Sequence, residues 1–296
     1  MGGWNRVRGM KTFVRILAGK ILGASRVTGP GGVSRTRPME GVIGLGRLGL
    51  AIGLALAGPC APAAQEGEAA GGELRAVLAS YRQALGGVAT AELTGFVEIG
   101  VQERGAEESV RLVYARAPRS LRIEVLTGEL RIVQGTDGAA VWAYAQRTGG
   151  ERMMLPLPPE AERGLRRAAL SACHDPLLKP ARLGYELTLR DESPKAEGQH
   201  LIEVSEGGRP VAYVRIDRET GRVLARWNAD GAGEVQVNRD YREVDGHLWP
   251  SEVIAVKEGV EVGRWRLADL RLDELPDPGL FAPPPDLPPS GTNSKL

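Results

Sequence analysis

The sequence predicts a mainly β protein with helical lids. We expect a strongly curved antiparallel sheet, or an unclosed β-barrel, of about eleven strands covered by an N-terminal helix and a mid-chain helical segment. Apolar and charged residues alternate through most of residues 93–272, turn sequences separate these runs, and only two segments have helical periodicity. The charged half of the strands predicts that one face of the sheet meets water, as in antiparallel sheets.

The first predicted helix covers residues 73–85. One apolar stripe runs along it at helical spacing: Leu74, Val77, Leu78, Tyr81 and Leu85. Gly86 and Gly87 follow and end the helix. The second helical segment, 158–174, begins with prolines, which are well placed in a first helical turn.

Short alternating runs on either side of the second helix predict the strands. The runs are 93–101, 110–114, 121–125, 130–134, 141–145, 185–190, 201–205, 211–217, 222–228, 233–241, 252–256 and 260–272. Turn pairs such as Asp137-Gly138 and Asp245-Gly246 separate several of them. So large a sheet either leaves a hydrophobic cavity beneath the helices or packs as a solid core with the helices on it. The pattern alone leaves both possibilities open.

Residues 41–64 have two incompatible interpretations. Gly44, Gly46 and Gly49 spell GxGxxG, the motif of dinucleotide-binding domains. That motif needs a strand before it and a second strand after it. Only Val42 and Ile43 precede it as strand-like residues, and no second strand follows. A dinucleotide-dependent oxidoreductase is therefore the last-ranked hypothesis.

The same residues fit an export signal. Residues 1–38 contain eight Lys or Arg and no acid, and 48–57 form an apolar run of ten residues. Ala61 and Ala63 supply the small residues before a cleavage site. We therefore expect an exported protein.

The expected organisation has three parts. Residues 1–63 are a basic leader and signal peptide, with Met39 a possible true start, 64–286 are the working domain, and 287–296 are a disordered tail. A lipid anchor on Cys60 is not expected, because a proline precedes it.

Charge separates the leader from the rest of the chain. Residues 1–63 carry nine Lys or Arg against one acid, whereas the remainder carries 29 against 36. Binding to nucleic acid phosphates requires an excess of clustered basic residues. We therefore expect no nucleic acid partner for the acidic body.

No group of residues in the body predicts catalysis, a metal site or a cofactor. Cys173 and His174 are adjacent, but neighbours in a chain usually point apart, so a plain buried thiol is favoured. His200 and Glu203 lie three apart on a strand and face opposite ways. We expect that this protein is not an enzyme.

One strand carries two aromatic residues on the same face, Trp142 and Tyr144. With Phe96, Met153 and Met154 they form either a flexible apolar binding site or ordinary core. The sequence does not decide between the two.

Four motifs occur in a characteristic order along the chain. They are Tyr114-Ala115-Arg116-Ala117-Pro118 with the strand after it, Asp137-Gly138-Ala139-Ala140-Val141-Trp142-Ala143-Tyr144, the hairpin 241–250, and the closing segment 277–284. With the signal peptide and the first helix, they resemble the periplasmic lipoprotein carrier family (LolA-like, lipoprotein-sorting proteins). The resemblance covers residues 71–286.

This resemblance implies an unclosed barrel whose apolar cavity holds acyl chains during transit across the periplasm, without an enzymatic step. It implies a monomer whose partners are lipid or lipoprotein acyl chains, and possible inner- and outer-membrane lipoprotein-transfer components. Arg116 matches an arginine that helps to close the lid, although Ala117 here separates it from Pro118. Relatives with this fold also act as envelope regulators that bind a membrane protein, which is the alternative function.

We expect the lipid-binding residues to be apolar positions on the first helix and on the strands. They are Leu74, Leu78, Phe96, Leu112, Ile123, Val125, Trp142, Tyr144, Met153 and Met154.

Overall fold

The computed structural model describes residues 68–87, 93–190, 197–230 and 233–285. The chain divides into two units, 1–50 and 51–296, and only the second contains described residues. The glycine motif, the export signal, Met39, Cys60 and the tail 287–296 lie outside the described residues.

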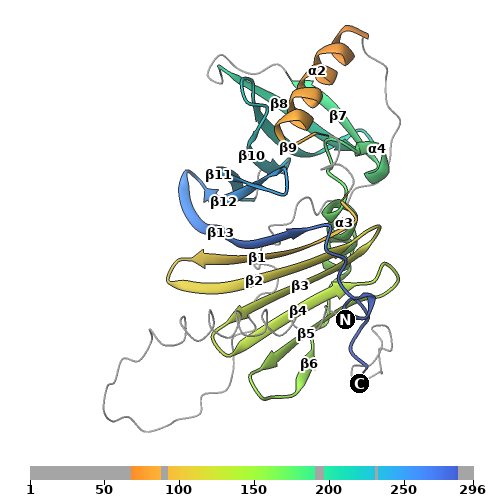
Figure 1. The fold of residues 1–296 in the computed structure, drawn as a ribbon, viewed down its shortest axis with the longest axis vertical. Coiled ribbons are helices and arrows are strands. Elements are labelled where there is room, and N and C mark those ends of the chain that lie inside the picture. Colours follow the sequence, from red (N-terminus) through yellow and green to blue (C-terminus); the bar gives the residue numbers. More distant parts are fainter. Residues whose placement is uncertain (1–67, 88–92, 191–196, 231–232, 286–296) are drawn as a thin grey trace. The chain divides into compact units, whose positions relative to one another are not determined.

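Thirteen antiparallel strands form one sheet that does not close (Figure 1). The strands are β1 (Gly95–Arg104), β2 (Glu107–Arg116), β3 (Ser120–Thr127), β4 (Leu130–Thr136), β5 (Val141–Arg147), β6 (Arg152–Met154), β7 (Tyr185–Arg190), β8 (Gln199–Glu206), β9 (Arg209–Asp217), β10 (Val223–Asn228), β11 (Val235–Val244), β12 (His247–Lys257) and β13 (Val260–Leu272). Their order is β6-β5-β4-β3-β2-β1-β13-β12-β11-β10-β9-β8-β7. The predicted fold class is confirmed, with more strands than the eleven expected.

The helical elements are α2 (Glu68–Ala84), α3 (Pro159–Ala172), α4 (Pro180–Leu183) and the 3-10 turn η4 (Pro278–Leu280). Both predicted helices are present. The short α4 was not predicted: it begins at Pro180 and ends at Gly184, whose φ of 72° only glycine adopts readily. α3 and α4 connect β6 to β7, the two edges of the sheet.

Two strands differ from the sequence-based expectation. β6 was missed, because three residues cannot display a period. β12 begins at His247 instead of residue 252, and it includes Pro250. Pro250 pairs with Tyr241 beside a register shift, where the lost N–H costs little.

The strand register defines two faces of the sheet, because directly opposed residues point the same way. The inner face, as we name it, carries Glu98, Arg111, Val125, Arg226 and Ile202, which the register connects from strand to strand. The outer face carries the residues that alternate with these.

α2 covers the inner face over β7, β8 and β9. Its Val77, Tyr81 and Leu85 pack in one apolar cluster with inner-face residues such as Ile202 and Val214. α3 lies against β2 to β5, and its Arg167 pairs with Glu206 at 2.8 Å. Glu206 opposes Tyr185 of the same apolar cluster, so α3 joins α2 on the inner face.

Candidate functional site

The structure divides the ten predicted lipid-binding residues between the two faces. Phe96, Ile123, Val125 and Met153 belong to the inner face by register, although Met153 at the sheet edge is 64% exposed. Leu74 and Leu78 of α2 pack against the apolar cluster of the same face. These six residues therefore lie along one side of the sheet.

Four others belong to the outer face: Leu112, Trp142, Tyr144 and Met154. Trp142 and Tyr144 stack with ring centroids 6.0 Å apart and form a buried cluster with Val133. The structure therefore does not bring them together with Phe96, whose ring instead lies 5.6 Å from that of Trp249. Whether any of the ten binds lipid stays a prediction.

The C-terminal segment, residues 276–281, crosses the outer face and is bound there by side chains of the sheet. Arg116 Nη1 donates to the Pro276 carbonyl at 2.9 Å, and Arg122 Nη1 donates to the Leu280 carbonyl at 2.9 Å. Trp142 Nε1 donates to the Phe281 carbonyl, also at 2.9 Å. Arg116 thus contacts the C-terminal segment, and its predicted gating role stays a prediction.

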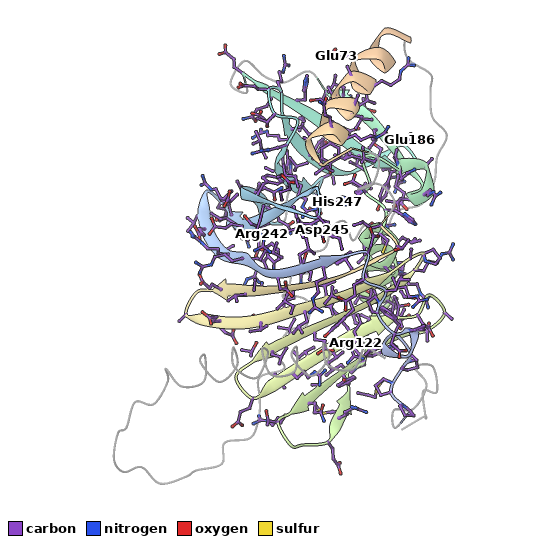
Figure 2. All side chains as sticks on the ribbon, viewed as in Figure 1. Glu73, Arg122, Glu186, Arg242, Asp245 and His247 are labelled. Atoms are coloured by element: carbon purple, nitrogen blue, oxygen red, sulfur yellow. The ribbon has the colours of Figure 1, made fainter. Side chains whose placement is uncertain are left out.

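An outer ionic cluster, formed by Arg122, Glu124 and Arg131, lies beside this segment, and Figure 2 labels its Arg122. Glu124 is only 6% exposed. Its carboxylate accepts hydrogen bonds from Arg122 Nε at 2.8 Å and from Arg131 Nη2 at 2.6 Å. Each buried charge in this cluster therefore has a close, hydrogen-bonded partner.

The inner face holds a second buried ion pair, Glu98 and Arg111, each 8% exposed. Their nearest charged atoms are 3.7 Å apart, beyond hydrogen-bond distance. Trp249 Nε1 donates to Glu98 at 3.2 Å, whereas Arg111 makes no hydrogen bond within the described part of the chain. Burial raises the pKa of Glu98, and the Arg111 charge only partly opposes this rise.

A second arginine of the inner face, Arg226, lies on β10. Four strands separate β2 from β10 in the sheet order, which corresponds to about 24 Å in a flat sheet. Burial lowers the pKa of Arg111, and the positive charge of Arg226 lowers it further. Arg111 and Arg226, which we call the arginine pair, thus share the inner face on strands that β1, β13, β12 and β11 separate.

Arg226 keeps free hydrogen-bonding capacity. Its Nε donates to Gln236 Oε1 at 2.9 Å, and its two terminal nitrogens have no hydrogen-bond acceptor among the described residues. Burial raises the pKa of Asp175, which lies between α3 and α4, and the positive charge of Arg226 partly opposes this rise. The Asp175 carboxylate accepts a hydrogen bond from the Tyr81 hydroxyl of α2 at 2.6 Å. Backbone N–H groups of Leu177 and Leu178 bond its other oxygen, so Asp175 has little capacity left for Arg226.

An indole N–H lies beside Arg111 as well. Trp265 packs over Gly100, where a Cβ would overlap the indole nitrogen, and Gly100 is the direct cross-strand partner of Arg111. Trp265 Nε1 is buried and has no hydrogen-bond acceptor among the described residues. Donors without acceptors therefore gather at this point of the inner face.

Apolar residues surround these donors and are only half-buried: Val125, Ile132, Val253 and Leu267. Val125 is the direct cross-strand partner of Arg111, and Leu267 that of Gly100. The candidate site is thus an apolar surface with hydrogen-bond donors at its centre. Sequence reasoning missed the arginine pair, because charged residues in alternating strands were assigned to a water-facing side. Burial of Glu98, Arg111 and Glu124 corrects that assignment.

The other titratable groups of the described residues show no nucleophilic or metal site. Burial raises the pKa of the Cys173 thiol to about 12, and Asp273 adds to the rise, so the thiol stays protonated near neutral pH. Burial lowers the pKa of His174. In the described ranges, no group of three or more His, Cys, Asp or Glu is placed to hold a metal ion. None of the helices described there is long and apolar enough to cross a bilayer.

Comparisons with known proteins give similar structures only. No family model matches the chain, and no curated protein matches it. A DUF1329 family protein from Desulfovibrio piger is similar at 9% identity, with 71% of this chain and 97% of that chain covered and a TM-score of 0.45. A LolA superfamily protein from Nitrosomonas europaea is similar at 14% identity over the same shares, with a TM-score of 0.42.

The structure of the Pseudomonas aeruginosa MucA/MucB complex is also similar, at 15% identity. It covers 70% of this chain and 61% of that chain, with a TM-score of 0.26. The Nitrosomonas protein is described as a LolA superfamily protein, and the sequence motifs of this chain resemble the LolA-like family. With TM-scores below 0.5, these three similarities say nothing about a ligand or partner of this chain.

Proposed function

We propose that this chain is an exported lipid-binding protein that carries acyl chains on the inner face of its sheet, beneath α2 and α3. One observation carries the proposal: half-buried apolar residues surround a polar centre on the face that both helices cover. An apolar surface with a few convergent polar groups is the usual composition of a small-molecule site. The carrier role requires no catalytic step.

Two neighbouring residues of β3 supply a matched test. Val125 and Leu126 are both half-buried, and they point to the inner and the outer face respectively. Val125→Asn should weaken the displacement of a hydrophobic dye by oleate at least fivefold, because it puts an amide on the apolar surface. Leu126→Asn should leave the displacement unchanged. Equal losses in the two variants, or no dye binding by the unaltered protein, would refute an inner-face lipid site.

The carrier role also predicts export and a bound lipid. The protein, purified without detergent after expression with its full N-terminal region, should begin near residue 64 and release lipid on solvent extraction. N-terminal sequencing and mass spectrometry of the extract measure both properties. A mature protein that retains residues 41–63 would contradict export, and a lipid-free protein that takes up no lipid would contradict carriage.

A further inference from the structure

The two edges of the sheet differ in how well they are protected from pairing with another strand. β6 has only three residues, and Pro156, Pro158 and Pro159 follow it closely. Proline lacks the N–H that an added strand would bond, so this edge is a poor template. β7, at the other edge, has six residues without proline or lysine, and its ladder with β8 contains no bulge. β7 therefore offers a regular edge to which another strand can be added.

The charges of β7 are arranged symmetrically about Thr188. Glu186 lies two residues before it and Arg190 two residues after it, and all three side chains are exposed on the outer face. When two copies of β7 pair antiparallel about Thr188, each Glu186 lies directly opposite an Arg190 of the other copy. Opposite charges in directly opposed positions stabilise a pair of strands, and like charges destabilise it. The strand is therefore complementary to itself in this register.

The present contacts of the two charged residues are compatible with this pairing. Glu186, labelled in Figure 2, has no ion-pair partner among the described residues. Arg190 binds Glu203 of β8 through Nε at 3.0 Å and Nη2 at 2.7 Å, and its side chain is still 51% exposed. Because a guanidinium carries several N–H donors, Arg190 can bind a further carboxylate while it keeps Glu203.

The inner face of β7 favours the same register. Leu187 and Leu189 are half-buried there and pack against the apolar cluster under α2. In the pairing about Thr188, each Leu187 lies opposite a Leu189 of the other copy, so the apolar surface continues from one copy to the next. Ion pairs on one face and apolar pairs on the other therefore support a single alignment.

We propose that two copies of this chain associate through their β7 edges, as an antiparallel pair centred on Thr188, so that the two sheets become continuous. The arrangement has two-fold symmetry, so the same surface serves both copies and the interface is closed. Six residues from each copy make a small interface, and small interfaces are weak. The dimer is therefore of micromolar affinity and exchanges with the monomer that the family resemblance implies. It forms whether or not the protein binds lipid.

Sedimentation equilibrium of the purified protein, from about 1 µM to about 1 mM, measures the association. The unaltered protein should pass from monomer to dimer across this range. Glu186→Arg should weaken the dimer about tenfold, because like charges then face each other at both opposed positions. Arg190→Glu should weaken it to a similar degree. An equimolar mixture of the two variants restores both ion pairs and should form a mixed dimer as tight as that of the unaltered protein.

Cysteine cross-linking gives a second measurement, which decides the proposal even if a charge variant fails to fold. Thr188→Cys places the thiols of two copies opposite each other, so a short bismaleimide should join them. Met153→Cys is the matched control, since Met153 is exposed at the opposite edge, on β6. The unaltered protein, treated in parallel, accounts for its own cysteines. A monomer at every concentration, folded charge variants that fail to form the mixed dimer, or equal cross-linking of the two cysteine variants would overturn the proposal.

Discussion

The two faces of the sheet carry similar buried polar groups, but the hydrogen bonds of these groups are satisfied to different degrees. Each face has a buried ion pair and a tryptophan packed over a glycine of the neighbouring strand, Trp142 over Gly135 outside and Trp265 over Gly100 inside. On the outer face, Trp142 Nε1 bonds the C-terminal segment. On the inner face, Trp265 Nε1 has no acceptor within the described residues.

The ion pairs repeat this difference. Glu124 is held by Arg122 and Arg131 through hydrogen bonds of 2.6–3.1 Å. Glu98 and Arg111 are each only 8% exposed, but their nearest charged atoms stay 3.7 Å apart. Unsatisfied buried polar groups are rare because each one costs free energy. Glu124 and Trp142 of the outer face therefore have hydrogen-bonded partners, whereas the indole N–H of Trp265 on the inner face has none in the described residues.

The largest expected effect is the loss of Glu124. Glu124→Leu leaves two guanidinium groups without their carboxylate, and breaking a buried pair in this way costs about 3–5 kcal/mol. We expect the lower part of that range, because the Arg131 side chain is 40% exposed. Urea unfolding measures the change in free energy. Glu261→Ala, at an exposed pair with Arg264, should show no measurable change; a similar loss there would remove the distinction.

A smaller effect on the free energy of unfolding is expected when Trp142 or Trp265 is replaced by Phe. Trp142→Phe loses the hydrogen bond to Phe281 and should lower the free energy of unfolding by about 1 kcal/mol more than the change in ring volume alone. Trp265→Phe has no such bond to lose. Thermal unfolding of both variants gives the comparison, and limited proteolysis should release the C-terminal segment faster in W142F. A greater destabilisation in W265F would contradict the contrast between the faces.

Removal of the whole inner pair should change stability least. Replacing a poorly bonded buried ion pair by residues of similar volume is often neutral or stabilising. The double variant Glu98→Gln with Arg111→Met should therefore unfold within about 1 kcal/mol of the unaltered protein. A cost comparable to that of Glu124→Leu would show that the inner pair is also structural.

The pH dependence of stability should have opposite signs on the two faces. Burial raises the pKa of inner Glu98, so its stabilising contribution is complete below the unfolded value of 4.5 and is lost as pH rises through the folded pKa. Hydrogen bonds from Arg190 lower the pKa of outer Glu203, so its contribution is present above 4.5 and is lost as pH falls through the folded pKa. Thermal midpoints against pH should flatten on the neutral side in Glu98→Gln and on the acid side in Glu203→Gln. The reverse assignment would contradict the burial argument.

The types of the elements followed from the sequence, but the faces did not. The run 121–125 lies within β3, and the stripe of Leu74 to Leu85 lies on α2, because periods of two and 3.6 are local properties. Alternation shows which residues share a face, but β1 and β5 carry buried residues on both faces. It therefore could not separate Trp142 from Phe96, which point to opposite sides.

The centre of the candidate site could not be predicted for a different reason. Arg111 and Arg226 share the inner face although four strands separate them, and no local pattern encodes the register that carries one face across those strands. Glu98 and Arg111 occupy the polar positions of alternating runs, which normally face water. Trp249, which bonds Glu98, and Trp265, which packs over the cross-strand partner of Arg111, contribute to their burial.

The most direct test of the inner-face site follows two tryptophans at once. The protein is labelled with 5-fluorotryptophan, its fluorine resonances are assigned by Trp→Phe variants, and oleate is added. Trp249, which bonds Glu98 and packs against Phe96, should shift with the titration, whereas Trp142 on the outer face should not. A shift of Trp142 while Trp249 stays unchanged would contradict lipid binding on the inner face.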